Sequence, residues 1–316
     1  MNTRLTTSRR AGSAIALGLG LLLSACVSNP SQPGDNSFAQ ALGALSSAAA
    51  QSGVPVGALG SQASTHLQTL QLVVQSLDNM DETREIELGR QLSSVLLGSA
   101  RALNDEPTQR YVNRLGRWIS LHSSRPHLPW TFVVLDNPGF NAFAAPGGYV
   151  FVTRGLLERT PTEAELAGVL AHEIVHVTQK HHLKAMVTQA RTQLGTQAAG
   201  HLLSRNGGDT VSGMLLNLGR ELYAKGLDRA DEFEADRMGV ALATRAGMDP
   251  YGLLALLQQM SGEQTNDPAF TLAFSTHPPT LQRVEYLRQA MGNRLDKFAA
   301  SSSPTLAQRI RSQRSR

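Results

Sequence analysis

Apolar side chains recur at helical spacing along most of the chain after residue 80. A first amphipathic helix is predicted to begin near Asp81, because acidic residues in its early turns are followed by Leu88, Leu92 and Leu96. The same period predicts a succession of helices in the rest of the chain. These helices are predicted over residues 108–120, 163–182, 184–203, 211–224, 230–246, 250–261 and 279–291.

Two short segments predict strands instead, over residues 130–135 and 149–153. Within the second segment, Val150 and Val152 share one face, because successive side chains of a strand point to opposite sides. The sequence therefore predicts an α+β fold class that is mainly helical, with many helices around one small sheet.

The first 26 residues follow the pattern of an export signal. Arginines precede an apolar run over residues 11–23, which is shorter than the roughly 20 residues that a membrane-spanning helix needs. The tetrapeptide Leu23-Ser-Ala-Cys26 resembles the lipobox of bacterial lipoproteins, in which the signal is cut before the cysteine and the cysteine is acylated. The alternatives are an ordinary signal peptide with an incidental cysteine, or an uncleaved anchor. Because Cys26 is the only cysteine, no intramolecular disulfide can form.

Composition divides the chain into four parts. A signal peptide (1–25) precedes a Ser-, Ala- and Gly-rich tether (26–80), a folded domain (81–295) and a basic tail (296–316) that is expected to be disordered. Arginines near the two ends exceed the formal net charge of +4, namely Arg4, Arg9, Arg10, Arg309, Arg311, Arg314 and Arg316. The body is therefore close to neutral, and nucleic acid is not an expected partner. The tail is either solvated, which we favour, or in contact with anionic lipid.

The strongest chemical signal is His172-Glu173-Ile-Val-His176. Two histidines four residues apart on a helix differ by about 40° around its axis, so both imidazoles can reach one ion. Glu173 projects from a neighbouring direction, where its carboxylate can hold a water molecule and accept its proton. Three protein ligands and a water form an open zinc site. One zinc ion per chain is preferred on ligand type, although spacing alone does not exclude another divalent metal.

The third ligand is expected on a second predicted helix, which carries Glu232 and Asp236. These two carboxylates are four residues apart and share a face, so one can bind the metal while the other orients a ligand histidine. Acidic residues in a first helical turn are also favoured by the helix dipole, which is the simpler interpretation for Asp231 and Glu234.

Together the two segments resemble the paired motif HExxH…ExxAD of the zinc metallopeptidases that include the HtpX heat-shock proteases and the CAAX prenyl proteases. The resemblance also covers residues 141–157 and Thr276-His-Pro-Pro-Thr280, and extends from about residue 81 to about residue 288. It implies a zincin-like metallopeptidase domain over 81–295, with a small sheet beside the active-site helix. It also implies that His172, His176 and Glu232 bind zinc and that Glu173 is the general base. Asp236 would contact one of the zinc ligands without binding the metal itself.

The resemblance further implies that residues 141–148 lie at the edge of the active-site sheet. Asn141, Ala144, Gly147 and Gly148 would then belong to an edge that receives the substrate as an added strand. A plain hairpin fits the sequence equally well.

Two other histidine positions have alternative interpretations. His277 either belongs to a turn before the helix that follows, or binds the zinc as a fourth ligand that displaces the water and makes the resting enzyme self-inhibited. His181 and His182 are expected to be exposed, because on a continuous helix His181 falls about 140° from His176.

The expected function is that of a zinc-dependent endopeptidase acting on unfolded or misassembled envelope proteins. The sequence lacks the transmembrane helices of some members of the family and shows no repeat at a fixed period, so with its lipobox it is similar to the compact outer-membrane lipoprotein branch. A lipid on Cys26 would hold it at the periplasmic face of the outer membrane. The alternatives are a chaperone-like or adaptor lipoprotein with a capped or structural zinc site, and a zinc hydrolase with another kind of substrate. The glutamate between the two histidines favours catalysis.

Overall fold

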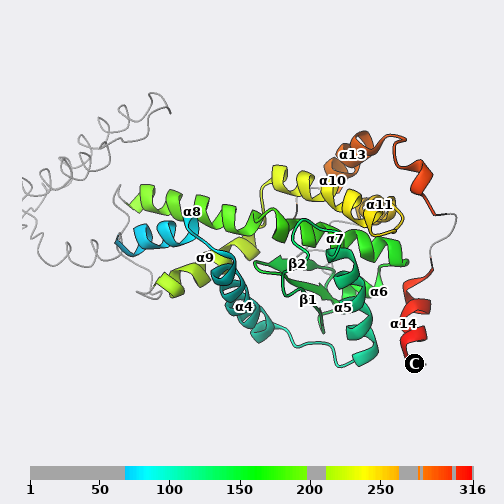
Figure 1. Ribbon diagram of the computed structural model, residues 1–316, viewed down its shortest axis with the longest axis horizontal. Helices are drawn as coiled ribbons and strands as arrows, with labels where there is room; N and C mark the ends of the chain where they lie inside the picture. The colour runs from blue at the N-terminus through cyan, green and yellow to red at the C-terminus, as the bar shows by residue number, and fades with distance from the viewer. Residues whose placement is uncertain (1–67, 198–210, 263–276, 278–279, 301–303, 315–316) are drawn as a thin grey trace, which may run out of the picture. The chain divides into compact units, whose positions relative to one another are not determined.

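The computed structural model describes residues 68–197, 211–262, 277, 280–300 and 304–314, which all belong to one compact unit, Leu59–Arg316. The predicted signal peptide, Cys26 and most of the predicted tether lie outside the described residues. The described part is mostly helical and contains a small sheet (Figure 1), so the predicted α+β class is confirmed. No described helix is long and apolar enough to cross a membrane.

The strands are β1 (Thr131–Leu135), β2 (Ala142–Ala145) and β3 (Tyr149–Thr153). The helices up to the end of the first motif are α4 (Glu82–Ser99), α5 (Glu106–Ser120), α6 (Arg154–Glu158) and α7 (Glu163–Thr178). The later helices are α8 (His181–Gln197), α9 (Val211–Lys225), α10 (Arg229–Arg245), α11 (Gly252–Gly262), α13 (Thr280–Met291), the short 3-10 helix η1 (Asp296–Phe298) and α14 (Leu306–Arg314). Residues 68–78 are also helical.

The central strand of the sheet is β3, since the strand order is β1-β3-β2. It pairs in parallel with β1, where Val150 lies opposite Phe132, and antiparallel with β2. The turn between β2 and β3 contains Gly147 and Gly148, both with positive φ, and a Cβ on Gly147 would lie 2.5 Å from the Cα of Ile86. Glycine is therefore required in this turn, which reverses the chain between the edge strand β2 and the central strand β3.

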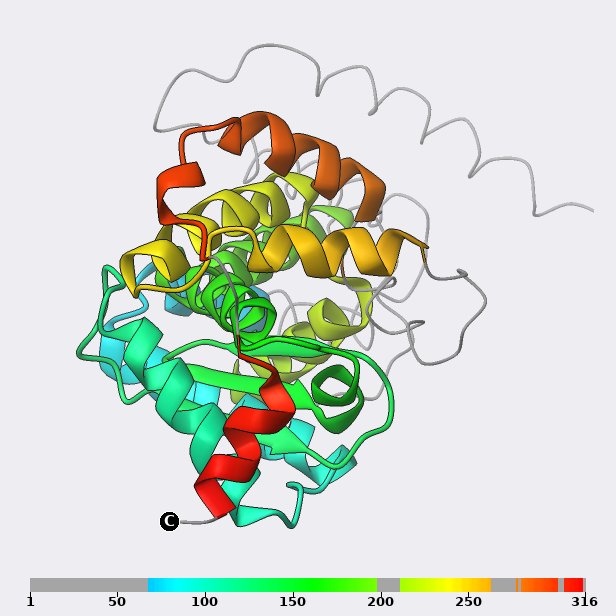
Figure 2. The same ribbon diagram turned by 90° about the vertical axis from the view of Figure 1, so that its right-hand side faces the viewer.

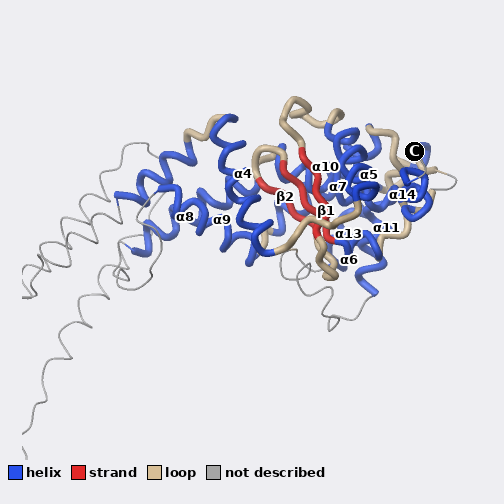
Figure 3. The backbone as a smooth tube through the Cα atoms, turned by 90° about the horizontal axis from the view of Figure 1, so that it is seen from below, coloured by secondary structure: helices blue, strands red, loops and turns tan. Residues whose placement is uncertain are grey.

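The two faces of the sheet pack against different helices. Val150 and Val152 belong to one face, which joins the larger apolar core with α5 and α7. The opposite face carries Phe151, whose ring stacks on Phe143 of β2, and Phe143 meets Tyr223 of α9 edge-on. A second apolar core lies among helix 68–78, α4, α8 and α9. Figure 3 shows the strands between these two groups of helices.

The helix of the first motif, α7, starts at a capping box and ends at Thr178, earlier than the predicted end at residue 182. The Thr162 side chain accepts a hydrogen bond from the Glu165 N–H, and the Glu165 carboxylate accepts one from the Thr162 N–H. The single helix predicted over 163–182 is wrong, because the structure divides it into α7 and α8. Lys180, between them, has φ 58, which interrupts a right-handed helix.

The folded body extends past the predicted boundaries at residues 81 and 295. Residues 68–78, which the sequence assigns to the tether, pack into the second core through one side of their helix. The tail that is expected to be disordered contains α14, which lies beside α5 (Figure 2). Leu306 is buried there, and Arg309 Nη2 lies 2.9 Å from a Glu163 oxygen. Apolar burial and this ion pair therefore order a segment that looks merely basic in the sequence.

One carboxylate connects three separate parts of the fold. Glu85 of α4 is fully buried (0% exposed). Its Oε1 accepts hydrogen bonds from Arg125 Nη1 at 2.7 Å and from the Gly147 N–H at 3.2 Å. Its Oε2 lies 3.1 Å from Lys180 Nζ. Glu85 thus joins α4 to the β2–β3 turn and to the turn between α7 and α8.

We expect Glu85→Gln to lower the free energy of unfolding by about 2 kcal/mol, because the buried group loses its charge-assisted hydrogen bonds while Arg125 keeps its pair with Glu82. Urea unfolding followed by circular dichroism measures this difference. Glu87→Gln is the matched control, since it removes an exposed pair with Arg90 on the same helix and should change little. Equal destabilisation by the two substitutions would contradict the connecting role of Glu85.

Candidate metal centre

The two sequence motifs lie on helices that pack directly against each other. His172, Glu173 and His176 are on α7, which is buried along almost its whole length. Gly239 marks the closest approach of α10, since a Cβ there would lie 3.0 Å from the His172 backbone nitrogen. This close packing brings Glu232, which is also on α10, beside His172 and His176.

Three ligand atoms converge at this interface. The Nε2 atoms of His172 and His176 are 3.0 Å apart. The two Glu232 oxygens lie 3.5 Å from His172 Nε2 and 3.4 Å from His176 Nε2. A tetrahedral zinc ion with bonds of about 2.0–2.1 Å separates its ligand atoms by about 3.3 Å. Both the donor types and their separations therefore fit zinc, and Glu232 Oε1 has no hydrogen-bond partner among the described residues.

Asp236 contacts His172 from the opposite side of the ring. Its Oδ1 lies 3.0 Å from His172 Nδ1, and its two oxygens accept hydrogen bonds from Arg283 Nε at 2.8 Å and Nη2 at 2.6 Å. Arg283 comes from α13 and is itself buried. A proton on His172 Nδ1 fixes the tautomer whose Nε2 is free to bind a metal. The sequence alone indicates no role for Arg283, because no spacing rule connects α13 to α10.

The pKa shifts at the site favour anionic carboxylates. Burial raises the pKa of Glu232, but charge from His277 and hydrogen bonds from His172 and His277 outweigh it and hold that pKa well below its usual range. Burial likewise opposes ionisation of Asp236, and Arg283 lowers its pKa in spite of this. Two ionised carboxylates in a buried site attract a cation.

The two histidines have opposite pKa shifts. Burial lowers the pKa of His172, but Asp236 and Glu232 outweigh it and raise that pKa to about 9. Burial, together with the charge of His172, holds the pKa of His176 well below its usual range. Without a metal, a proton on His172 therefore partly neutralises the carboxylates. A metal ion takes over this role and releases that proton.

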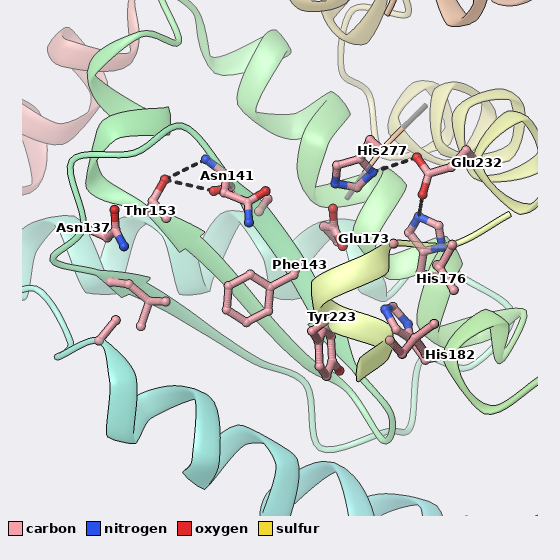
Figure 4. Close-up of a pocket in the computed structure, with 16 residues that line it drawn as sticks. Asn137, Asn141, Phe143, Thr153, Glu173, His176, His182, Tyr223, Glu232 and His277 are labelled. Atoms are coloured by element: carbon pink, nitrogen blue, oxygen red, sulfur yellow. Dashed lines mark hydrogen bonds and ion pairs between the residues drawn. The ribbon is translucent and has the colours of Figure 1, made fainter. Parts of the chain in front are cut away.

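A pocket of about 320 Å³ opens beside these ligands. Figure 4 shows Glu173, His176, Glu232 and His277 gathered at one end of it. Glu173 is buried, which raises the pKa of its carboxyl group, and its Oε2 has no hydrogen-bond partner among the described residues. Its carboxylate is therefore available to a molecule that enters the pocket.

The other side of the pocket is formed by β2 and the residue before it. The buried Asn141 lines the pocket, and its Oδ1 has no hydrogen-bond partner among the described residues. The Tyr223 hydroxyl, from α9, donates a hydrogen bond to the Ala144 carbonyl at 2.8 Å. Gly147 and Gly148 lie instead in the turn against α4 and do not line the pocket. The structure thus brings Asn141 to the site, while the two glycines shape the hairpin.

His277 reaches the site from the segment before α13. Its Nδ1 lies 2.8 Å from Glu232 Oε2, and its ring centroid is 5.8 Å from that of His172. Atoms of His172, Glu232 and His277 lie close enough together to hold one metal ion. His277 is therefore placed to contact the ligand carboxylate, which a simple turn residue would not do.

His181 and His182 are buried, so the expectation that they are exposed is wrong. That expectation assumed a continuous helix, whereas the chain turns at Lys180 and directs His181 back toward the motif. His181 Nδ1 lies 2.9 Å from His176 Nδ1. The sequence shows that a histidine follows the motif closely. It does not show the turn at Lys180, which brings that histidine into contact with His176.

A buried HExxH helix, a carboxylate from a second helix and a further carboxylate facing a pocket define a zincin-like metallopeptidase. The comparison with known families agrees, because the model of Peptidase family M48 matches residues 106–291. The chain belongs to this family, whose members are zinc-dependent metallopeptidases that act on polypeptides. The predicted resemblance to the HExxH…ExxAD metallopeptidases is confirmed.

Proteins similar to this chain include bacterial and mitochondrial proteases. The beta-barrel assembly-enhancing protease of Escherichia coli (strain K12) is 29% identical over 227 residues, which are 70% of this chain and 46% of that protein. A putative beta-barrel assembly-enhancing protease of Vibrio cholerae is 30% identical, over 65% of this chain and 44% of that protein. Mitochondrial metalloendopeptidase OMA1 of Schizosaccharomyces pombe is 33% identical, over 58% of this chain and 53% of that protein. The chain spans about half the length of the curated relatives it matches.

We expect Gly239→Ala to weaken zinc binding by up to about tenfold, because the added methyl group pushes α10 away from the His172 backbone and displaces Glu232. Competition with a zinc chelator measures the affinity. Gly98→Ala is the matched control, since a Cβ at this position on α4 meets nothing within 4 Å. Unchanged zinc affinity in Gly239→Ala would show that the close packing of the two helices is not needed to assemble the ligands.

Proposed function

We propose that the protein is a zinc-dependent endopeptidase that hydrolyses peptide bonds of unfolded or misassembled envelope proteins. The observation that carries this proposal is the buried carboxylate of Glu173, which lines the same pocket as His176 and Glu232 and has an oxygen without a partner among the described residues. A structural zinc site needs no such carboxylate, whereas hydrolysis needs a base at this point.

The proposed mechanism assigns the proton transfers to Glu173. Its carboxylate orients the attacking water, accepts the proton and passes it to the leaving amine. Burial raises the pKa of Glu173, which makes its carboxylate a stronger base toward the proton of the water than an ordinary carboxylate. When held by His172, His176 and Glu232, zinc supplies Lewis acidity that acidifies water and polarises the peptide carbonyl.

The edge of β2 that pairs with no other described strand supports an extended polypeptide as the substrate. The Thr153 N–H donates to the Asn141 carbonyl, so by the alternation of an antiparallel ladder the backbone groups of Ala142 and Ala144 point away from β3. A peptide strand added there would run past Glu173, and backbone hydrogen bonds would bind it with little sequence preference. The Asn141 amide is placed to add a hydrogen bond to such a strand.

A location in the bacterial envelope follows from the sequence and from the relatives. Acylation of Cys26 would attach the mature protein to the periplasmic face of the outer membrane. Two relatives are named beta-barrel assembly-enhancing proteases, which supports an envelope protein as the substrate. The membrane is then a partner through the lipid, and unfolded envelope proteins are partners through the pocket.

We expect Glu173→Gln to lower the rate of casein cleavage by at least about 100-fold while one zinc ion per chain is retained, because the substitution removes the base and leaves the ligands. Unfolded casein and the purified mature protein lacking Cys26 are suitable, with zinc measured by atomic absorption. Glu158→Gln, at an exposed glutamate of α6, is the control and should cleave like the wild type. Full activity in Glu173→Gln would end the proposal.

A capped state of the same site is the second candidate. The contact between His277 Nδ1 and Glu232 favours it, since a histidine that binds the metal as a fourth ligand would leave no position for the water. In the resting protein His277 would then inhibit the enzyme. If the cap were permanent, the protein would instead act as a chaperone-like or adaptor lipoprotein.

We expect His277→Ala to raise the rate of casein cleavage in proportion to the capped fraction, so by about tenfold for a site that is capped nine-tenths of the time. Zinc content is measured alongside the rate. His277→Ala with zinc retained and a lower rate would assign His277 to substrate or transition-state binding instead. No cleavage by either protein, each with one zinc, would favour the chaperone-like or adaptor role.

A further inference from the structure

A buried contact between two histidines extends the metal centre away from the pocket. His176 Nδ1 lies 2.9 Å from His181 Nδ1, and the two rings are inclined at 74°. His181 is fully buried (0% exposed) and His176 is 1% exposed. Water therefore does not compete for these nitrogen atoms, and one of them has to donate a proton to the other.

Proton counting decides the direction of this hydrogen bond, given the metal ligands proposed above. If His176 Nε2 binds a metal, it carries no proton, so the proton of the neutral ring is on Nδ1. His176 then donates to His181 Nδ1, which accepts. The proton of the neutral His181 ring must accordingly be on Nε2.

The surroundings of His181 Nε2 match this assignment. The atom lies 3.3 Å from a Glu234 oxygen and 3.7 Å from an Asp231 oxygen, both on α10. Both carboxylates are acceptors, so the Nε2–H has a place to donate. A continuous path thus runs from His176 through His181 to the acidic first turns of α10.

We infer that His181 is a positioning residue, which orients the zinc ligand His176 and fixes its tautomer through the Nδ1 contact. The arrangement parallels the opposite side of the site, where Asp236 does the same for His172. The inference rests on the proposed zinc site but not on proteolysis. A hydrogen-bond acceptor at Nδ1 also makes Nε2 a better donor to the metal.

The alternative for the same atoms is a second metal site. His181, Asp231 and Glu234 lie close enough together to hold an ion. Binding at His181 Nε2 would require its proton to move to Nδ1, against His176 Nδ1, which already carries one when zinc is bound. Two metals would therefore force two N–H groups to face each other at 2.9 Å. Proton counting thus favours the positioning role.

The local fold explains how His181 reaches this position. Lys180, which follows α7, has φ 58, so that the chain turns there and α8 starts at His181 in a new direction. The Lys180 ammonium group lies 3.1 Å from the buried Glu85. This ion pair holds the turn from the far side, and the turn directs the His181 ring toward His176.

The test is zinc affinity, measured by chelator competition on the full purified protein. We expect His181→Phe to weaken zinc binding by about 10–100-fold, because the ring is kept but the acceptor is lost. His181→Gln keeps an acceptor and should restore part of the affinity. His182→Phe is the matched control, since this buried neighbour contacts the His176 ring edge-on at 5.7 Å and should leave zinc affinity nearly unchanged.

A second readout separates positioning from packing. Nitrogen-15 spectra of the histidine rings in the zinc-loaded protein should show a proton on His176 Nδ1 and on His181 Nε2. A proton on His181 Nδ1, or two zinc ions per chain that fall to one in His181→Phe, would overturn the inference in favour of a second site. Wild-type affinity in His181→Phe would also overturn it.

The proposed function fails separately. If His181→Phe binds zinc as tightly as the wild type while Glu173→Gln is inactive with zinc retained, the peptidase stands and the role of His181 falls. If the wild type binds no zinc, both fall. A merely structural role would lower the melting temperature of the metal-free protein in His181→Phe and leave the affinity of the folded fraction unchanged, which counts against positioning.

Discussion

The interface between α7 and α10 buries three carboxyl groups, those of Glu173, Glu232 and Asp236, none more than 2% exposed. An isolated charge in such an environment is strongly destabilising, by several kcal/mol or more after relaxation. The Arg283 guanidinium balances one of the three. If all three are ionised and the histidines are neutral, a formal charge of −2 is left, which a divalent cation neutralises. The need to compensate this charge explains why a metal fits here.

The groups that compensate the site come from distant parts of the chain. Arg283 contacts Asp236 from α13, and His277 contacts Glu232 from the segment before α13. His181 contacts His176 from the start of α8. Each of the two candidate ligand histidines, His172 and His176, therefore contacts a further polar side chain that tertiary packing places there. The candidate metal centre is a property of the assembled helices rather than of the α7 motif, and a displaced helix would leave a buried charge without a partner.

Local patterns predicted the parts of this arrangement that lie within one element. The burial of α7, the strand at 149–153 and the shared helical faces of the two motifs depend on spacings of two to four residues, which the sequence states directly. The break at Lys180 was missed because a left-handed residue ends α7 where the sequence has neither glycine nor proline to signal it, and the contact of Lys180 with Glu85 of α4 is equally invisible in the sequence. The pairing of Arg283 with Asp236 and of Tyr223 with Ala144 joins separate elements in the same way, and no periodicity encodes it.

The edge of β2 faces a competition within the molecule. The Tyr223 hydroxyl already binds the outward Ala144 carbonyl, so a substrate strand that pairs at this residue has to displace it. A neutral hydrogen bond of this kind contributes about 1 kcal/mol, and each backbone hydrogen bond of an added strand contributes about as much. Two or more such bonds therefore outweigh the contact with Tyr223. Most strands of a folded protein are already paired, so only an exposed edge strand or loop of it could supply them, whereas any extended unfolded segment can. If the proposed function holds, an edge that binds backbone with little sequence preference would thus favour unfolded chains over folded ones.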